Sequence, residues 1–141
     1  MILDRSNWSY SPLDLHNEWT RKAHQFRSLI SDFGSRFETL TPLIRLVEHI
    51  SKSEISYHLF PGEKLNELII NTTIDGKVDD RYCLKIQLML DDPEKIEMSY
   101  FKKGKDSQNS IVWNFICNQY DLIETFDTFI SANVEFKGTN S

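Results

Sequence analysis

The sequence predicts an α+β fold with two N-terminal helices, a five-stranded antiparallel β-meander and a C-terminal helix packed on one face of the sheet. Two observations predict the helices: apolar residues recur at helical spacing within residues 11–52, and they do so again after residue 118. A third predicts the sheet, because the apolar period becomes two from Glu54 onward and the links between the alternating runs are too short for a crossover helix.

The first helix is expected to begin at Pro12 and to end near Gly34. Ser11 suits an N-cap, proline is tolerated in a first helical turn, and Asp14 completes a capping box. The predicted buried stripe holds Leu15, Trp19, Phe26, Leu29, Ile30 and Phe33, and the predicted solvent face holds Glu18, Arg21, Lys22, Gln25 and Asp32.

Two further segments have helical periodicity. Thr41 and Pro42 repeat the cap-plus-proline signal and predict a second helix through about Lys52, buried through Leu43, Leu46, Val47 and Ile50. Asn118, followed by Asp121 three residues later, predicts the start of a C-terminal helix that ends near Ala132. Its apolar side is Leu122, Ile123, Phe126, Phe129 and Ile130.

Five strands are predicted between the second and last helices, at residues 55–60, 65–74, 82–90, 96–101 and 111–117. Turn-forming residues separate them, and Asp75-Gly76 favours a hairpin over a calcium loop because the distal ligands of such a loop are lacking. The clean alternation from Tyr82 to Leu90 marks the core face, whereas residues 111–117 are apolar on both parities. This last strand is therefore the first place to expect an interface.

Composition favours one cytoplasmic domain over residues 1–141, with residues 1–10 as an arm and 137–141 as a frayed tail. The net charge is −5, and residues 54–100 hold ten acids against five bases, so binding to nucleic acid is not expected. Cys83 and Cys117 are too few for a disulfide scaffold, and no apolar run predicts a leader or a membrane span.

No motif predicts catalysis. The five glycines form no nucleophile elbow, P-loop or dinucleotide turn, and the four histidines and two cysteines lack metal-ligand spacing. Paired acids such as Glu124 and Asp127 are ordinary on the polar face of a helix. The sequence therefore assigns no catalytic residue, cofactor or metal, and it leans away from an enzyme.

Two functional hypotheses remain. The favoured one is a noncatalytic protein-binding module of the inhibitor, immunity or regulatory-subunit type, which binds another protein, a basic one included, or a second copy, through the exposed sheet face or acidic turns. Its candidate residues are Phe60, Glu63, Asp91, Asp92, Glu94, Phe101, Val112 and Ile116. The alternative is a small-molecule-binding roll, with or without an enzyme activity, that has an aromatic pocket lined by Trp19, Tyr82, Tyr100, Trp113 and Phe115.

Overall fold

A computed structural model describes residues 9–34, 39–62, 67–89, 91–92, 94–103 and 109–137. These residues form three α-helices, α1 (Pro12–Phe33), α2 (Thr41–Ser51) and α3 (Leu122–Ala132), and three short 3-10 helices, η3 (Glu54–Tyr57), η4 (Gln119–Asp121) and η5 (Val134–Phe136). The strands are β1 (Leu59–Pro61), β2 (Glu67–Ile74), β3 (Lys77–Leu88), β4 (Lys95–Lys103) and β5 (Asn109–Asn118). The predicted α+β class and order of elements are confirmed.

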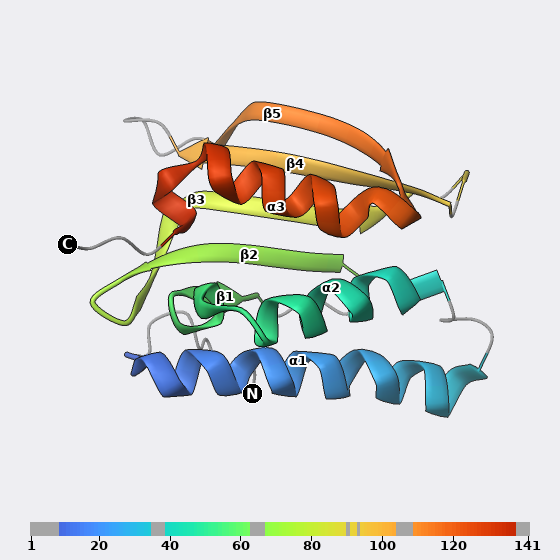
Figure 1. Ribbon diagram of the computed structural model, residues 1–141, viewed down its shortest axis with the longest axis horizontal. Helices are drawn as coiled ribbons and strands as arrows, with labels where there is room; N and C mark the ends of the chain where they lie inside the picture. The colour runs from blue at the N-terminus through green and yellow to red at the C-terminus, as the bar shows by residue number, and fades with distance from the viewer. Residues whose placement is uncertain are drawn as a thin grey trace.

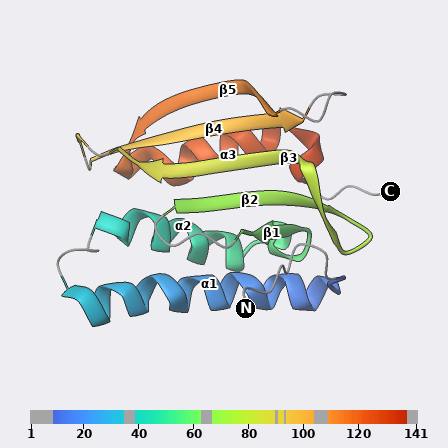
Figure 2. The same cartoon turned by 180° about the vertical axis from the view of Figure 1, so that it is seen from behind.

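The sheet is a meander in the order β1-β2-β3-β4-β5, and each neighbouring pair is antiparallel. In Figure 1, α3 lies across one face of this sheet beside α2, and α1 runs along the edge formed by β1. Figure 2 shows β3, β4 and β5 in front of α3, so the opposite face carries no helix from the described ranges. The C-terminal helix thus covers one sheet face, as predicted.

The main core fills the space between the helices and the covered sheet face. Trp19 and Phe26 enter it from α1, Leu46 from α2 and Phe126 from α3, and all four are fully buried. Leu84 and Ile86 of β3 are also fully buried, which confirms the core face predicted from the alternation along this strand. The side chain of Phe33 and residue Leu90, which the sequence also assigned to buried faces, lie outside the described part of the chain.

The start of α1 is confirmed in detail, but part of its predicted solvent face is wrong. Ser11 and Asp14 form the expected capping box. Lys22, however, is only 1% exposed, and Glu18 is also buried. The Lys22 ammonium donates a hydrogen bond to the Gly62 carbonyl oxygen at 3.0 Å, because α1 packs beside β1 and not only against a flat sheet.

Three predicted boundaries also need correction. Thr41 is the first residue of α2 and not its cap, because Leu40 occupies the cap position without a side-chain hydrogen bond. Residues 54–57 form η3, where Ser53 accepts a hydrogen bond from the Ile55 amide, so the first strand begins only at Leu59. In the C-terminal segment Asn118 caps η4, and α3 follows at Leu122.

The predicted turn at 75–80 is a two-residue turn followed by strand. Asp75 and Gly76 both have positive φ, and β3 begins at Lys77. The pairing then jumps from Thr72 opposite Asp79 to Asn71 opposite Cys83, which leaves Asp80, Arg81 and Tyr82 as extra residues on β3. This bulge redirects the tip of the β2–β3 hairpin away from the plane of the sheet (Figure 1).

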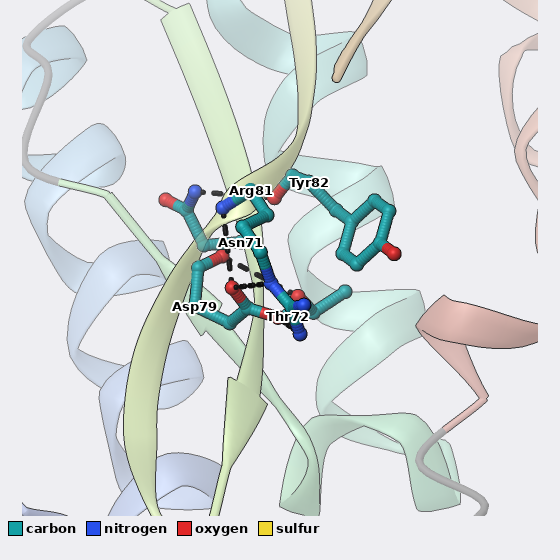
Figure 3. Close-up of polar contacts among 5 residues, drawn as sticks. All are labelled: Asn71, Thr72, Asp79, Arg81 and Tyr82. Atoms are coloured by element: carbon teal, nitrogen blue, oxygen red, sulfur yellow. Dashed lines mark hydrogen bonds and ion pairs between the residues drawn. The ribbon is translucent and has the colours of Figure 1, made fainter. Parts of the chain in front are cut away.

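A polar cluster holds the bulge in place (Figure 3). The Arg81 guanidinium donates two hydrogen bonds to the Asp79 carboxylate, at 2.9 and 3.0 Å, and the Asn71 amide donates to the Tyr82 carbonyl oxygen at 3.3 Å. Burial opposes ionisation of Asp79, but the hydrogen bonds and charge of Arg81 outweigh it and hold the pKa of that carboxyl below its ordinary value. The bulge is thus stabilised by an ionised pair.

The N-terminal segment is anchored at Ser9 and Tyr10, the first described residues. Ser9 pairs with Lys77, the Tyr10 amide donates to the Gly76 carbonyl oxygen at 2.7 Å, and Tyr10 packs on Phe60 with ring centroids 5.2 Å apart. The predicted arm is therefore fixed at residues 9 and 10, while residues 1–8 lie outside the described part. Of the predicted tail, Lys137 is described as a turn and residues 138–141 are not described.

Candidate functional site

β5 carries the largest group of exposed large apolar side chains in the described molecule. Four large side chains lie there, with exposed fractions of 61% for Ile111, 55% for Val112, 45% for Phe115 and 46% for Ile116. β5 pairs with β4 on one side, and no described strand pairs with its other side. We call these four residues the β5 patch.

The pairing with β4 explains why β5 is apolar on both faces. Phe115 lies opposite the buried Met98 and therefore on the helix-covered face, whereas Ile116 lies opposite Glu97 on the bare face. Tyr100 pairs with Trp113 and Phe101 with Ile111, so Val112 is the extra residue of a bulge.

The two edges of the sheet differ in whether other side chains cover them. At the β1 edge, the Trp19 indole donates to the Leu59 carbonyl oxygen at 2.9 Å, and Lys22 donates to the Gly62 carbonyl oxygen. Side chains of α1 therefore cover that edge. β5 has no such cover from the described residues, and its ten residues include no charged side chain. Natural edge strands usually carry charges, prolines or a covering element that prevent pairing with other chains.

A cleft of about 850 Å³ lies between β5 and α3. Trp113 and Phe115 form one wall, with ring centroids 5.8 Å apart and an interplanar angle of 14°, and Trp113 also packs on Phe129 of α3 at 5.3 Å. Asp121 and Glu124 line the opposite wall. The hollow thus combines aromatic side chains with two carboxylates.

Acidic groups dominate the sequence around this cleft. Residues 109–136 contain Asp121, Glu124, Asp127 and Glu135 but no lysine, arginine or histidine. Asp127 lies 2.9 Å from His49 Nε2, and Glu135 accepts a hydrogen bond from the Tyr100 hydroxyl. The two acids on the cleft wall therefore face the hollow beside one cleft-lining base, Lys95.

The middle of the bare sheet face is polar and internally hydrogen-bonded. Gln87 donates to Glu97 at 2.7 Å, and Asn114 donates to Glu97 at 3.1 Å and to Ser99 at 2.8 Å. These hydrogen bonds, that of Gln87 foremost, lower the pKa of Glu97. Lys85 pairs with Glu67 on the same face. The apolar surface is consequently limited to the β5 side and does not extend across the sheet.

The residues predicted to bind a partner are only partly brought together. Val112 and Ile116 are exposed on β5, and Phe101 is half-buried beside Ile111. Phe60 is 3% exposed, so its expected exposure is wrong, because Tyr10 and Leu15 pack with its ring in a second buried cluster.

The acidic turn between β3 and β4 lies close to the same site. Asp91 and Glu94 are exposed, Asp92 is half-buried, and the Gln119 amide donates to the Glu94 carbonyl oxygen at 2.8 Å. This bond places the turn beside the end of β5. Glu63, the remaining acid of the predicted set, lies outside the described residues.

Three of the five residues predicted to line a pocket meet in the β5–α3 cleft: Tyr100, Trp113 and Phe115. Trp19 is fully buried in the core, and Tyr82 lies between Arg81 and Lys102, whose charged groups are 5.4 and 5.7 Å from its ring. The predicted enclosed pocket with all five residues is therefore not formed. Sequence reasoning missed the acidic wall, because only the fold brings α3 next to β5.

Cys83, Cys117 and the His16–Ser56 pair are side chains of the types that serve as nucleophiles and bases. Burial raises the pKa of Cys83 to about 11 and also raises the pKa of Cys117, so both thiols stay protonated at neutral pH. His16 Nδ1 lies 2.8 Å from Ser56 Oγ, but that hydroxyl is fully buried and donates to the Ser53 carbonyl oxygen. In this arrangement the hydroxyl proton of Ser56 is engaged by the Ser53 carbonyl oxygen and not by His16.

Metal-ligand grouping, helix length and a second hollow also bear on function. Within the described ranges, no three histidine, cysteine or acidic side chains are grouped so that they could hold a metal ion. None of the helices there has both the length and the apolar character needed to cross a bilayer. A second hollow of about 540 Å³ is lined by Tyr57, Ile74 and Val134, near the start of α1 at Pro12.

The chain matches no protein-family model, no curated protein and no solved structure.

Proposed function

We propose that this chain is a noncatalytic protein-binding module of the inhibitor, immunity or regulatory-subunit type, and that its contact surface is centred on the β5 patch. The observation that carries the proposal is an uncharged edge strand with large exposed apolar side chains on both faces. Covering such a strand removes apolar area from water and satisfies backbone groups at the same time.

The remaining surface supports the same choice. The polar ladder on the bare sheet face is suited to water, and the acidic turn at Asp91 and Glu94 extends the negative surface beside β5. A basic protein would meet apolar and acidic groups together. A cytoplasmic location belongs to the same proposal, supported by the free state of Cys83 and Cys117.

A small-molecule function is the second candidate. Its support is the cleft itself, where Trp113, Phe115 and Phe129 present aromatic surface of the kind that lines ligand sites. The exposure of Ile111, Val112 and Ile116 favours the protein partner, because these side chains extend the apolar surface along β5 beyond what a small ligand covers.

Native mass spectrometry of the chain purified gently from its own host tests the proposal. The wild type is compared with a Val112→Lys/Ile116→Lys variant and with a control, Ile74→Lys/Val134→Lys, which places the same charges on exposed apolar positions away from β5. We expect a stoichiometric second polypeptide on the wild type and the control and its loss from the β5 variant. A bare chain that carries a small molecule, or a partner retained by the β5 variant, would overturn the proposal.

A further inference from the structure

We infer that the outer edge of β5 takes up an extended, basic segment of a partner polypeptide as a sixth strand of the sheet. Alternate apolar side chains of this segment enter the β5–α3 cleft, and its lysine or arginine side chains face Asp121 and Glu124. This inference rests on the proposed protein-binding function and specifies its mode and the chemistry of the partner.

The backbone is the first support. At the β1 edge, α1 side chains already bond the carbonyl oxygens of Leu59 and Gly62, whereas the outer side of β5 has no partner from the described residues. β5 is ten residues long, enough to pair with an extended segment over roughly 30 Å. Strand addition would satisfy its outward backbone groups.

Side-chain placement is the second support. Successive residues of a strand point to opposite faces, so every second residue of an added strand would lie on the helix-covered side, next to Trp113 and Phe115. The cleft there accommodates apolar side chains. The intervening residues would lie on the bare face, next to Asn114 and Ile116.

The charge distribution favours a basic segment over a second copy of the chain as the strand that pairs with β5. A second copy of the chain would bring another net charge of −5 and another uncharged β5, with no base anywhere in residues 109–136 to face Asp121 and Glu124. A basic segment would supply that counter-charge. Electrostatic complementarity at an interface raises the rate of encounter and disfavours partners of the same sign.

A displayed library of random twelve-residue peptides, selected on the full chain, provides the test. The expected winners carry apolar residues and lysine or arginine at every second position, because the apolar wall and the two acids lie in the same cleft. Methylation of single backbone nitrogens in a winning peptide should weaken binding about tenfold at every second position and leave the intervening positions unaffected. Winners without this period of two, or no enrichment at all, would overturn the inference.

Charge reversal tests the recognition of basic residues. Selection on an Asp121→Lys/Glu124→Lys variant should turn the preference of the library from lysine and arginine to aspartate and glutamate. The control, Asp32→Lys/Glu54→Lys, makes the same change in charge at exposed positions of α1 and η3 and should keep the original preference. An unchanged preference on the cleft variant would refute the role of the two acids.

Sedimentation of the purified chain tests whether a second copy of the chain binds the β5 edge instead. We expect a monomer, and a dimer that Val112→Lys dissociates would assign the edge to a second copy instead. If the host partner depends on Val112 and Ile116 but the library shows no basic, strand-like winners, the binding function stands and only the strand-addition mode fails.

Discussion

Trp113 and Phe115 stack on each other two residues apart on β5, although nearly half of Phe115 is exposed. The contact with Trp113, which itself packs on Phe129, fixes the orientation of the Phe115 ring without burying it. An exposed aromatic ring held in one orientation is typical of a binding surface, because little side-chain entropy is lost when a partner covers it.

Phe115→Ala should therefore affect stability far less than Phe126→Ala. Phe126 of α3 is fully buried, and its truncation is expected to lower the free energy of unfolding by about 3–5 kcal/mol. Truncation of Phe115 is expected to lower it by about 1 kcal/mol or less. Urea unfolding of both variants measures the difference, and equal losses would show that the cleft is closed in solution.

Asp79→Asn should destabilise the fold at neutral pH and make its free energy of unfolding less dependent on pH in the acidic range. Because the pKa of Asp79 is lowered in the folded state, the stability it contributes is present above the unfolded pKa of about 3.9 and is lost as the pH falls through the folded value. We expect a loss of roughly 1.5–3 kcal/mol at pH 7, from the broken hydrogen bonds with Arg81. Unfolding midpoints measured at several pH values from about 2 to about 7, a range that spans these pKa values, provide the measurement.

Asp91→Asn is the matched control for this prediction, because Asp91 is exposed in the turn between β3 and β4. If both substitutions change stability equally at every pH, the ion pair with Arg81 does not stabilise the bulge.

The environment of the Tyr100 hydroxyl predicts that the fold loses stability at alkaline pH. Burial, followed by the hydrogen bond and negative charge of Glu135, raises the pKa of the Tyr100 hydroxyl. The resulting stabilisation is present below the unfolded tyrosine pKa of about 10 and is lost as the pH rises above it toward the folded value. Tyr100→Phe should therefore flatten the alkaline decline of the free energy of unfolding, whereas Tyr120→Phe removes an exposed phenol and serves as the control. Parallel declines in wild type and Tyr100→Phe would contradict this assignment.

Gly76→Ala should cost more stability than Gly34→Ala. Both glycines have positive φ, 81° and 65°, so either alanine would be strained by about 1–2 kcal/mol. A Cβ at Gly76 would also lie 2.2 Å from the Tyr10 carbonyl oxygen, whereas a Cβ at Gly34 would meet no atom within 4 Å. Thermal unfolding compares the two, and equal shifts of Tm would mean that the N-terminal segment moves aside freely.

Much of the fold could be predicted because local signals and tertiary packing agree. The capping box at Ser11 and Asp14, the helical spacing in α2 and the alternation along β3 each specify the structure that forms. The predicted strand at 55–60 was wrong at its start, since the serine hydroxyls at 53 and 56 bond the backbone and favour a 3-10 turn there.

The features that sequence could not predict depend on contacts between distant segments. Lys22 is polar in every local pattern, yet the carbonyl oxygen of Gly62 holds it in the interior. The two-sided apolar pattern of residues 111–117 correctly marked an unusual strand. Only the sheet order shows that this strand is an edge, and only the packing of α3 brings Glu124 opposite Trp113.

An uncharged edge strand also lowers the solubility of the unbound chain at high concentration. Ten residues rich in isoleucine, valine and aromatic side chains, without a charge or a proline, resemble the segments from which β-aggregates grow. The overall negative charge keeps molecules apart in dilute solution, but salt screens that repulsion. Solubility of the isolated chain should accordingly fall with ionic strength, and co-expression with the proposed partner polypeptide should restore it.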